Sequence, residues 1–257
     1  MTTYGFVGVG SIASAMVEGL CDGVADAPPV VLSPRSEARS RELAGRLPTV
    51  SVAASNQEVV ERSDIVIVAV LPQQAAHVLG DLEFRPGQVV ISVMAGVGLE
   101  MIVDAVEPAT EVARSIPLPA VAGRRGETPI FPSTNAARQL FSRLGGYAEL
   151  PSERAFEAVA AASATVAAHL WYLDSIKAWL CAEGIDPQFA ARYVATTFVD
   201  VAGEINPSRV DFRALASNHA TAGGLNEQFS QHLAQAGAYE AVAEGLDGLL
   251  RRLTAIG

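Results

Sequence analysis

Short apolar runs alternate with segments of helical periodicity along the first half of the chain. This order predicts an α/β fold, a doubly wound parallel sheet with helices on both faces. The run that follows Asp64 stays apolar as far as Val70, as expected for a strand that helices cover on both sides. We expect a first strand just before Gly8 and further strands at Val30–Leu32, Val50–Val52, Asp64–Val70, Gln88–Met94 and Glu111–Ala113. The spacing of apolar residues predicts helices at Ala13–Leu20, Glu37–Arg46 and Leu99–Val106.

The second half has a different pattern, because alanine-rich helical sequence continues from about Leu150 nearly to the end. Turn residues interrupt it at 184–187, 206–208 and 223–224. Asp186 before Pro187 is typical of an N-cap followed by the first turn of a helix. We therefore expect two domains: a Rossmann-type nucleotide-binding domain over residues 1–150 and an all-helical domain over residues 151–257.

The most apolar long stretch is Ala155–Leu173. It contains Glu157 and His169 and is rich in alanine rather than leucine, so we expect a buried helix and not a membrane span. His169, Trp171 and Tyr172 lie together on it, and two interpretations are open. They line a ligand pocket, or they pack in the core, which is the usual place of large aromatic side chains.

Charge and cysteine content narrow the class of protein. Of the 257 residues, 50% are hydrophobic and 18% are charged, which predicts an ordered chain. The formal net charge of −10 argues against nucleic acid or an anionic membrane as partner. Cys21 and Cys181 are too few for a disulfide framework or a cysteine-based metal site, and we expect no metal. A glycine-rich turn that begins at residue 8 leaves no room for a signal peptide, so we expect a cytoplasmic enzyme.

That turn has the pattern GxGxxA and joins the first expected strand to the first helix. Gly8 permits the tight turn, Gly10 lets the backbone approach a pyrophosphate, and Ala13 is small enough for the helix to pack on the strand. The N–H groups at the helix start, from Ser11 and Ile12, favour an anion. The alternative is an ordinary glycine-containing turn, but the position after a strand and before a helix favours a dinucleotide site.

The residues after the second strand indicate which dinucleotide binds. NAD-binding units usually place an Asp or Glu there, where it accepts a hydrogen bond from the ribose 2′-OH. This chain has Ser33 instead, with Arg35 two residues later. A hydroxyl and a guanidinium suit a 2′-phosphate, so we expect NADP, with NADPH preferred over NADH. The alternative is that Arg35 is a solvated residue at the start of a surface helix, like Arg39 and Arg41.

Ligands of open α/β sheets bind beyond the carboxyl ends of the strands. The residues at these places are Val70, Leu71 and Pro72 after the fourth strand, Ala95 and Gly96 after the fifth, and 114–119 after the sixth. The small residues at 95 and 96 keep side-chain bulk away from the expected place of a nicotinamide. The alternative for Pro72 is that it only ends its strand.

These residues, in this order, resemble the motifs of the pyrroline-5-carboxylate reductase family. The family has GxGxM near the start, a V-K-P turn, an A-G-I turn, an R-x-M-P-N-x-P segment, an S-G-S-G-P-A-Y helix start and a C-terminal S-P-G-G-T-T loop. The counterparts here are Gly8–Ile12, Val70–Pro72, Ala95–Val97, Arg114–Pro119, Ser163–Ala168 and Thr221–Asn226. The resemblance covers essentially the whole chain, and the last loop is its most distinctive part.

The resemblance implies a reductase that transfers a hydride from NADPH to the C=N carbon of a cyclic imino acid, which in the parent case completes proline biosynthesis. It also implies a helical half that forms a homodimer, or a higher oligomer, by interlocking with its twin. In the family the glycine loop meets the substrate carboxylate with backbone N–H groups, which here belong to Gly223, Gly224 and Leu225. Asn226 stands where the family has a Thr that contacts the imine nitrogen, and Asn226 and Thr221 are the expected catalytic groups.

The loop also has a physical reason to bind a carboxylate, because N–H groups at a helix start form a concave anion site. A substrate that arrives as an iminium is already electrophilic, so positioning does most of the work. The alternative is that the glycines only cap a helix. Glu227 in the first turn is a favourable capping residue. His219 ahead of the loop is a proton donor or a residue that structures the loop.

Three departures from the family motifs lie near the expected reaction centre. Leu71 replaces a Lys, the Arg114–Pro119 segment lacks the Asn and is one residue shorter, and Ser163–Ala168 has lost the GSGPAY pattern. We expect a retained cofactor half and a changed substrate, a larger or less polar imine. Two other functions stay open: a related NADP oxidoreductase that acts on a carbonyl or a deazaflavin, and a non-catalytic dinucleotide-binding protein.

Overall fold

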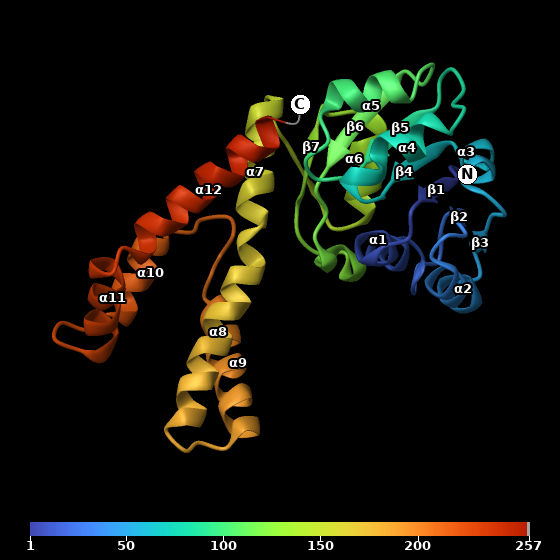
Figure 1. The fold of residues 1–257 in the computed structure, drawn as a ribbon. Coiled ribbons are helices and arrows are strands. Elements are labelled where there is room, and N and C mark those ends of the chain that lie inside the picture. The colour runs from blue at the N-terminus through green and yellow to red at the C-terminus, as the bar shows by residue number, and fades with distance from the viewer. Residues whose placement is uncertain (256–257) are drawn as a thin grey trace. The chain divides into compact units, whose positions relative to one another are not determined.

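The computed structural model describes residues 1–255, and a single eight-stranded sheet organises the first part of the chain (Figure 1). The strand order is β3-β2-β1-β4-β5-β6-β7-β8. All neighbours pair in parallel except β6 and β7, which are antiparallel. The strands are β1 (Tyr4–Val7), β2 (Val30–Leu32), β3 (Val50–Val52), β4 (Ile65–Val68), β5 (Val89–Ser92), β6 (Glu111–Ser115), β7 (Thr128–Phe131) and β8 (Tyr147–Glu149).

Helices connect the strands and then make up the rest of the chain. Those of the first part are α1 (Ser11–Cys21), α2 (Glu37–Arg46), α3 (Asn56–Arg62), α4 (Ala75–Gly80), α5 (Leu99–Ala105) and α6 (Asn135–Arg143), with the 3₁₀ helices η1 (Pro72–Gln74) and η2 (Pro119–Gly123). Those that follow are α7 (Glu153–Ser163), α8 (Thr165–Ala182), α9 (Pro187–Gly203), α10 (Phe212–His219), α11 (Leu225–Gln235) and α12 (Ala238–Thr254).

The sheet separates two hydrophobic cores, because side chains alternate between its faces along every strand. Phe6 of β1 and Ile67 of β4 belong to the core under α1 and α6. Their chain neighbours Val7 and Val68 belong to the core under α3, α4 and α5. Both faces are therefore buried, which explains why the strands of the sequence are continuously apolar.

The predicted Rossmann-type sheet is confirmed, and all six predicted strands are present as β1 to β6. The sequence did not indicate β7 and β8. Thr128–Phe131 contains a proline, and Tyr147–Glu149 has only three residues with little apolar alternation, so neither has a strand pattern of its own. They form because β6 offers an edge on which β7 pairs through Arg114 and Ser115.

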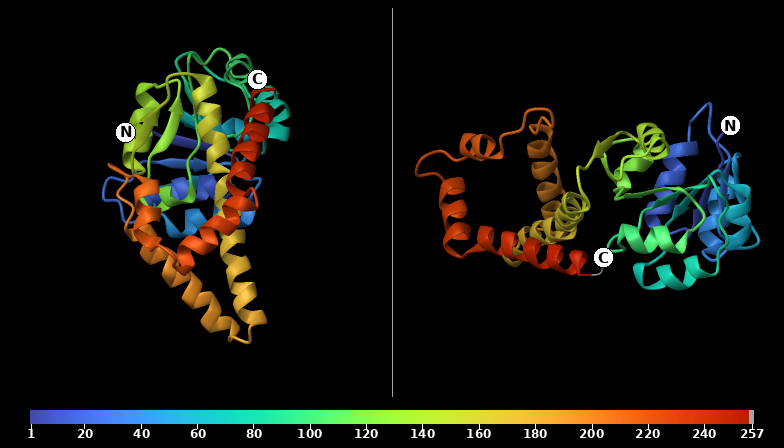
Figure 2. Two further views of the ribbon diagram at one scale, coloured as in Figure 1. Left: turned by 90° about the vertical axis from the view of Figure 1, so that its left-hand side faces the viewer. Right: turned by 90° about the horizontal axis from the view of Figure 1, so that it is seen from above.

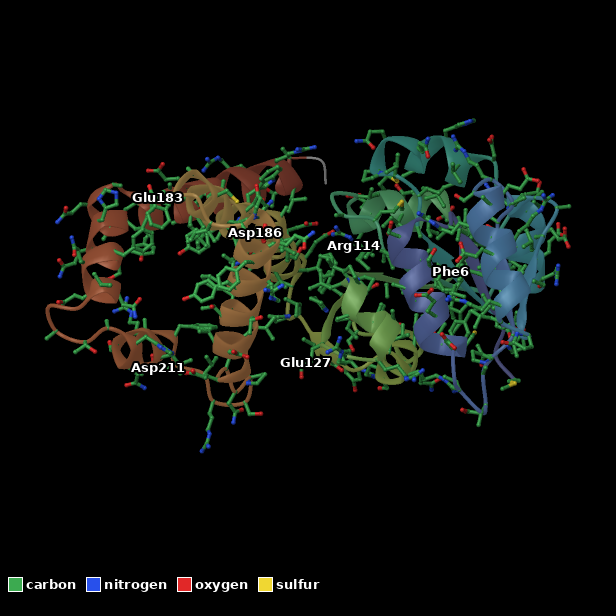
Figure 3. The ribbon with its side chains drawn as sticks, turned by 90° about the horizontal axis from the view of Figure 1, so that it is seen from below. Phe6, Arg114, Glu127, Glu183, Asp186 and Asp211 are labelled. Atoms are coloured by element: carbon green, nitrogen blue, oxygen red, sulfur yellow. The ribbon has the colours of Figure 1, made fainter. Side chains whose placement is uncertain are left out.

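A buried arginine attaches the start of α7 to the sheet. Arg114 of β6, which Figure 3 labels, is 1% exposed. Its guanidinium lies 2.7 Å from the Glu153 carboxylate and 2.6 Å from that of Glu157. The same group lies over the Phe156 ring, 4.6 Å from its centre. Glu153 also accepts a hydrogen bond from the Leu99 N–H. One cation thus holds the first turns of α7 and the start of α5 to the sheet.

Contacts divide the chain into two compact units. The first contains residues 1–160 and the described residues from Leu249 onward, and the second contains residues 161–248. The predicted division into domains over residues 1–150 and 151–257 stays a prediction. Figure 2 shows the second unit, in yellow to red, as helices without a sheet. Within it α8 packs on α9, and the predicted cap of α9 is confirmed: the Asp186 carboxylate accepts from the Phe189 N–H at 2.9 Å.

The prediction of one buried helix over Ala155–Leu173 is wrong. Two helices, α7 and α8, meet at residue 164, and α8 has no buried residue in this single chain. Trp171 is 71% exposed and Tyr172 is 38% exposed, so these aromatic side chains are not in a core. The physical reason is that α8 packs mainly on α9, which covers only part of its surface.

Neither cysteine forms a disulfide, and burial raises the pKa of the Cys21 thiol. In the stretch from Met1 to residue 255, no helix is both long and apolar enough to cross a membrane.

Replacing Arg114 tests the role of the buried cation. We expect Arg114→Ala to lower the free energy of unfolding by about 3–5 kcal/mol, because Glu157 would remain buried without a counter-charge. Urea unfolding followed by circular dichroism measures the change. Arg41→Ala is the control, since Arg41 is exposed and pairs with Glu37 of the same helix, so its loss should cost less than about 0.5 kcal/mol. Equal unfolding midpoints for the two variants would contradict the assignment.

Candidate functional site

The turn between β1 and α1 has a backbone that only glycine fits. Gly8 has a φ of +93°, and a Cβ atom there would lie 2.7 Å from the Ala69 carbonyl oxygen. The turn therefore rests on the end of β4, which positions the start of α1 next to the carboxyl ends of β1 and β4. Gly10 is exposed and has open space where a side chain would lie. The backbone at Gly10 is thus accessible to a ligand, as the fingerprint predicts.

The amino end of α1 is suited to an anion. Gly10 is its N-cap and provides no side-chain cap, and the first turn contains no acidic residue. Within residues 1–255, no protein group accepts a hydrogen bond from the N–H groups of Ser11, Ile12 and Ala13. The helix dipole and these free donors favour a phosphate at this place.

The structure gives Ser33 a different role from the one we predicted. Ser33 is fully buried, and its hydroxyl accepts a hydrogen bond from the Gly8 N–H at 2.9 Å. Its carbonyl oxygen accepts from the Ser40 hydroxyl, also at 2.9 Å. The predicted contact of Ser33 with a 2′-phosphate stays a prediction, and in this structure its hydroxyl is buried against the glycine turn. Ser33 instead ties the end of β2 to the glycine turn.

Two arginines lie beside the glycine turn. Arg35 is exposed at the end of β2 and reaches the Gln74 side-chain oxygen at 3.5 Å, which places its guanidinium near η1. Arg39 of α2 donates to the Val9 carbonyl oxygen at 3.4 Å. We expected Arg39 only as a surface residue, and its position four residues after Arg35 is the signal that could have indicated its place beside the turn. Neither arginine has an acidic partner among the described residues.

The residues after β4 and β5 form the same edge of the sheet, since parallel strands end together. Val70 is half-buried, whereas Leu71 and Pro72 are exposed, Leu71 by 63%. Ala95 is exposed after β5, and Gly96 is buried with a φ of +74°. The structure thus brings the predicted residues of the first unit together at one edge, beyond the carboxyl ends of β1, β2, β4 and β5.

The predicted substrate loop belongs to the second unit and connects α10 to α11. Gly223 has a φ of +71°, and Gly224 is the N-cap of α11. Two of the three predicted donors already have partners: the Gly223 N–H donates to the Glu227 carboxylate at 2.7 Å, and the Gly224 N–H donates to the Thr221 carbonyl at 2.8 Å. The Leu225 N–H has no acceptor among the described residues.

Polar side chains around this loop hold one another. The Asn226 side-chain nitrogen donates to the His219 carbonyl oxygen at 2.9 Å, which leaves its oxygen Oδ1 as an acceptor. The His219 ring lies 3.0 Å from the Glu204 carboxylate, so His219 structures the loop here. We expected Glu227 as a capping residue and did not predict its hydrogen bond to the Gly223 N–H. The sequence signal for this contact is the spacing of Glu227, which lies four residues after Gly223 and three after the N-cap Gly224.

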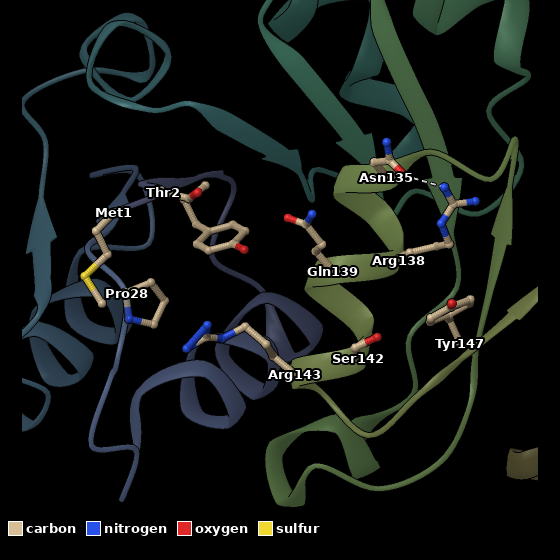
Figure 4. A pocket seen from close by; sticks show the side chains of 10 residues that line it. Met1, Thr2, Pro28, Asn135, Arg138, Gln139, Ser142, Arg143 and Tyr147 are labelled. Atoms are coloured by element: carbon tan, nitrogen blue, oxygen red, sulfur yellow. Dashed lines mark hydrogen bonds between the residues drawn. The ribbon is translucent and has the colours of Figure 1, made fainter.

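A pocket of about 570 Å³ lies away from these residues, at the amino-terminal ends of β1 and β2 (Figure 4). Pro28, which precedes β2, lines it together with Arg138 and Arg143 of α6. Both arginines have acidic partners, Glu149 and Asp26. None of the residues predicted for the cofactor or the substrate lines it. Across residues 1–255, no group of three or more His, Cys, Asp or Glu side chains could hold a metal ion.

Comparison with known proteins gives a consistent result. A family model described as "NADP oxidoreductase coenzyme F420-dependent" matches residues 3–96, the segment from β1 to the turn after β5. The chain is 30% identical over 209 residues to a pyrroline-5-carboxylate reductase of Methanosarcina acetivorans, with 77% of each chain covered. It is 26% identical over 263 residues to pyrroline-5-carboxylate reductase 2 of Bacillus subtilis, covering 98% of this chain and 94% of the relative.

Solved structures share the fold over the full length. A pyrroline-5-carboxylate reductase of Streptococcus pyogenes matches with a TM-score of 0.84 at 22% identity, covering 99% of this chain and 98% of the other. A Plasmodium falciparum pyrroline carboxylate reductase with NADP bound matches with a TM-score of 0.82 at 17% identity, covering 100% and 98%. These likenesses establish the fold of both units.

The position of Arg35 beside the glycine turn allows a test of the preference for NADPH over NADH. We expect Arg35→Asp to weaken NADPH binding by about 1–3 kcal/mol more than NADH binding, because a charge-assisted contact to the 2′-phosphate is lost. Fluorescence titration of the reduced nicotinamide measures both affinities. Arg41→Asp makes the same change of charge on α2 at a residue paired with Glu37, and should affect both cofactors equally. Equal losses for Arg35→Asp would contradict a 2′-phosphate contact.

Proposed function

The chain belongs to the pyrroline-5-carboxylate reductase family, and we propose that it transfers a hydride from NADPH to the C=N bond of a cyclic imino acid. The observation that carries this proposal is the free amino end of α1 beside the accessible Gly10 backbone and two arginines, Arg35 and Arg39, that have no acidic partner among residues 1–255. These features fit an anionic dinucleotide in a chain whose net charge is −10. The match to full-length reductases supports the choice of reaction.

The residues of the first unit fit the cofactor. The N–H groups of Ser11 and Ile12 bind the diphosphate, and Gly10 gives it room because no protein atom fills the space at its missing side chain. Arg35 binds the 2′-phosphate, and Ser33 keeps the turn in shape through the Gly8 N–H. When bound, NADPH supplies the hydride from its nicotinamide ring. Residues 70–72 and 95–96, at the same edge, line the place of that ring.

The loop of the second unit fits an imine with a charged nitrogen. The Leu225 N–H is the free backbone donor, and Gly223 and Gly224 are donors whose internal partners a substrate has to replace. Asn226 holds its own nitrogen on His219 and offers Oδ1 to accept a hydrogen bond from an iminium N–H. The Asn226 oxygen, as an acceptor, stabilises the cationic substrate in position. The hydroxyl of Thr221 is a second polar group of the same loop.

The other functions considered are less well supported. The model that names a deazaflavin coenzyme matches only residues 3–96, which contain the glycine turn and no part of the helical second unit. A protein that only binds a dinucleotide does not require the polar loop at 221–226, which keeps the donors and acceptors described above.

We propose further that two copies associate through the helical unit. Large apolar side chains stay uncovered in one chain: Trp171 is 71% exposed, Val199 69%, Phe212 66% and Leu225 85%. Exposed apolar side chains that gather on one surface mark association sites. A second copy of the chain, with the same faces, would cover them as an isologous partner.

Turnover tests the reaction. We expect NADPH oxidation, followed by its absorbance, when pyrroline-5-carboxylate or a related cyclic imine is added, and a lower kcat/KM with NADH. Asn226→Ala should lower kcat at least about tenfold, because a positioned acceptor is lost. Gln228→Ala, two residues after Asn226 on α11, is the control. Oxidation of NADPH by keto or aldehyde substrates but by no imine would overturn the proposal.

Sedimentation equilibrium tests the association. We expect a mass of at least two chains of 26.8 kDa. Val199→Glu should shift the protein towards one chain, because a charge on a covered apolar face loses its hydration. Val103→Glu makes the same change at an exposed valine of α5 and should leave the mass unchanged. A wild-type mass of one chain at micromolar concentration would contradict this proposal.

A further inference from the structure

The loop at 221–226 already contains a carboxylate of its own. Glu227 extends from the first turn of α11 back to the Gly223 N–H, where Oε2 accepts at 2.7 Å. This distance is typical of a charge-assisted hydrogen bond. The Gly224 N–H is turned towards Thr221 in the same loop. The donors of the loop are therefore largely satisfied before any substrate binds.

The charges around the loop disfavour a second anion there. A substrate carboxylate that accepts from the Gly223 N–H has to displace Glu227 or lie against it, and like charges in contact repel. Glu204 is a further carboxylate of the neighbourhood, held by the His219 ring. The other groups that contact the loop, Asn226 and the His219 carbonyl, bear no charge. Among the described residues, no lysine or arginine forms a hydrogen bond or ion pair with the loop.

The imine nitrogen of the substrate fits the acceptors of this loop better than the carboxylate does. The Asn226 oxygen and the Glu227 carboxylate are acceptors, and an iminium is a cation with an N–H donor. An internal carboxylate thus favours the cationic part of an imine while it competes with an anionic substituent. Glu227 repels only the carboxylate substituent of the substrate. The loop therefore discriminates between imines with and without a carboxylate.

We propose that Glu227 is a specificity-determining residue, and that this chain also reduces cyclic imines that bear no carboxylate. The inference rests on the proposed function, since it concerns the same site. The chemistry balances without a further reactant: the hydride and its electron pair leave NADPH for the imine carbon, and the C=N π pair moves to nitrogen. The protonated imine becomes an amine, and NADPH becomes NADP⁺.

Two cyclic imines of the same ring size test the proposal: pyrroline-5-carboxylate and unsubstituted pyrroline, each with NADPH and the full-length protein. For Glu227→Ala we expect the carboxylate substrate to show a KM about tenfold lower with little change in kcat, because a competitor for its binding is removed. Unsubstituted pyrroline should show the same KM or a higher one. Glu227→Gln, which keeps an acceptor but removes the charge, should give a smaller change in the same direction.

Glu240→Ala is the matched control, because Glu240 is also an acidic residue in the first turn of a helix, α12. It should leave the ratio of kcat/KM for the two imines unchanged. An unchanged ratio in both Glu227 variants would overturn the inference, and so would a wild-type enzyme that reduces the carboxylate substrate but not unsubstituted pyrroline.

A binding measurement separates this inference from the proposed reaction. Calorimetry with L-proline and with pyrrolidine, in the presence of NADP⁺, reports on the same site without turnover. Glu227→Ala should bind L-proline about tenfold more tightly and pyrrolidine no more tightly. If neither imine is reduced, the proposed function fails, while a gain in L-proline affinity still supports the role of Glu227. Equal L-proline affinity in wild type and variant contradicts it.

Discussion

The close approach of the glycine turn to the ends of the neighbouring strands is the constraint on which the cofactor half depends. The Gly8 N–H is held by the Ser33 hydroxyl at the end of β2, and its Cα lies against the Ala69 carbonyl beyond β4. Three strands are thereby locked together where α1 begins. Only a residue without a Cβ satisfies this geometry, and it directs the free N–H groups of α1 beyond the sheet edge.

Burial on both sheet faces makes this edge rigid. Each strand contributes side chains to two separate cores, so a shift of one strand would disturb both. Arg114 extends the same frame to α7, because its two carboxylate partners lie on the first turns of that helix. A buried cation with two anions tolerates little displacement, since each charge needs its partner in contact.

The helical unit follows a different principle. Its helices present more apolar surface than the chain itself covers, with Trp171 and Leu225 as the clearest cases. Its polar groups, by contrast, satisfy one another locally: Asp186 caps α9, Glu204 holds His219, and Glu227 holds Gly223. Local polar contacts fix the loop shapes, while large apolar side chains of the same helices stay uncovered in a single chain. This division connects the proposed association with the proposed substrate loop, because both belong to the same helices.

The sequence by itself determined the features that depend on local pattern. Apolar runs predicted β1 to β6, the bounds of α2 were correct to the residue, and Asp186-Pro187 marked the start of α9, because strand burial and helix capping act over a few residues. Contacts between distant residues could not be determined in this way. Only the tertiary structure turned the Ser33 hydroxyl inward to Gly8, brought Arg39 to the glycine turn and added β7 at the edge of β6. It also left Trp171 uncovered, because whether an apolar helix is buried depends on which partners surround it and not on its own composition.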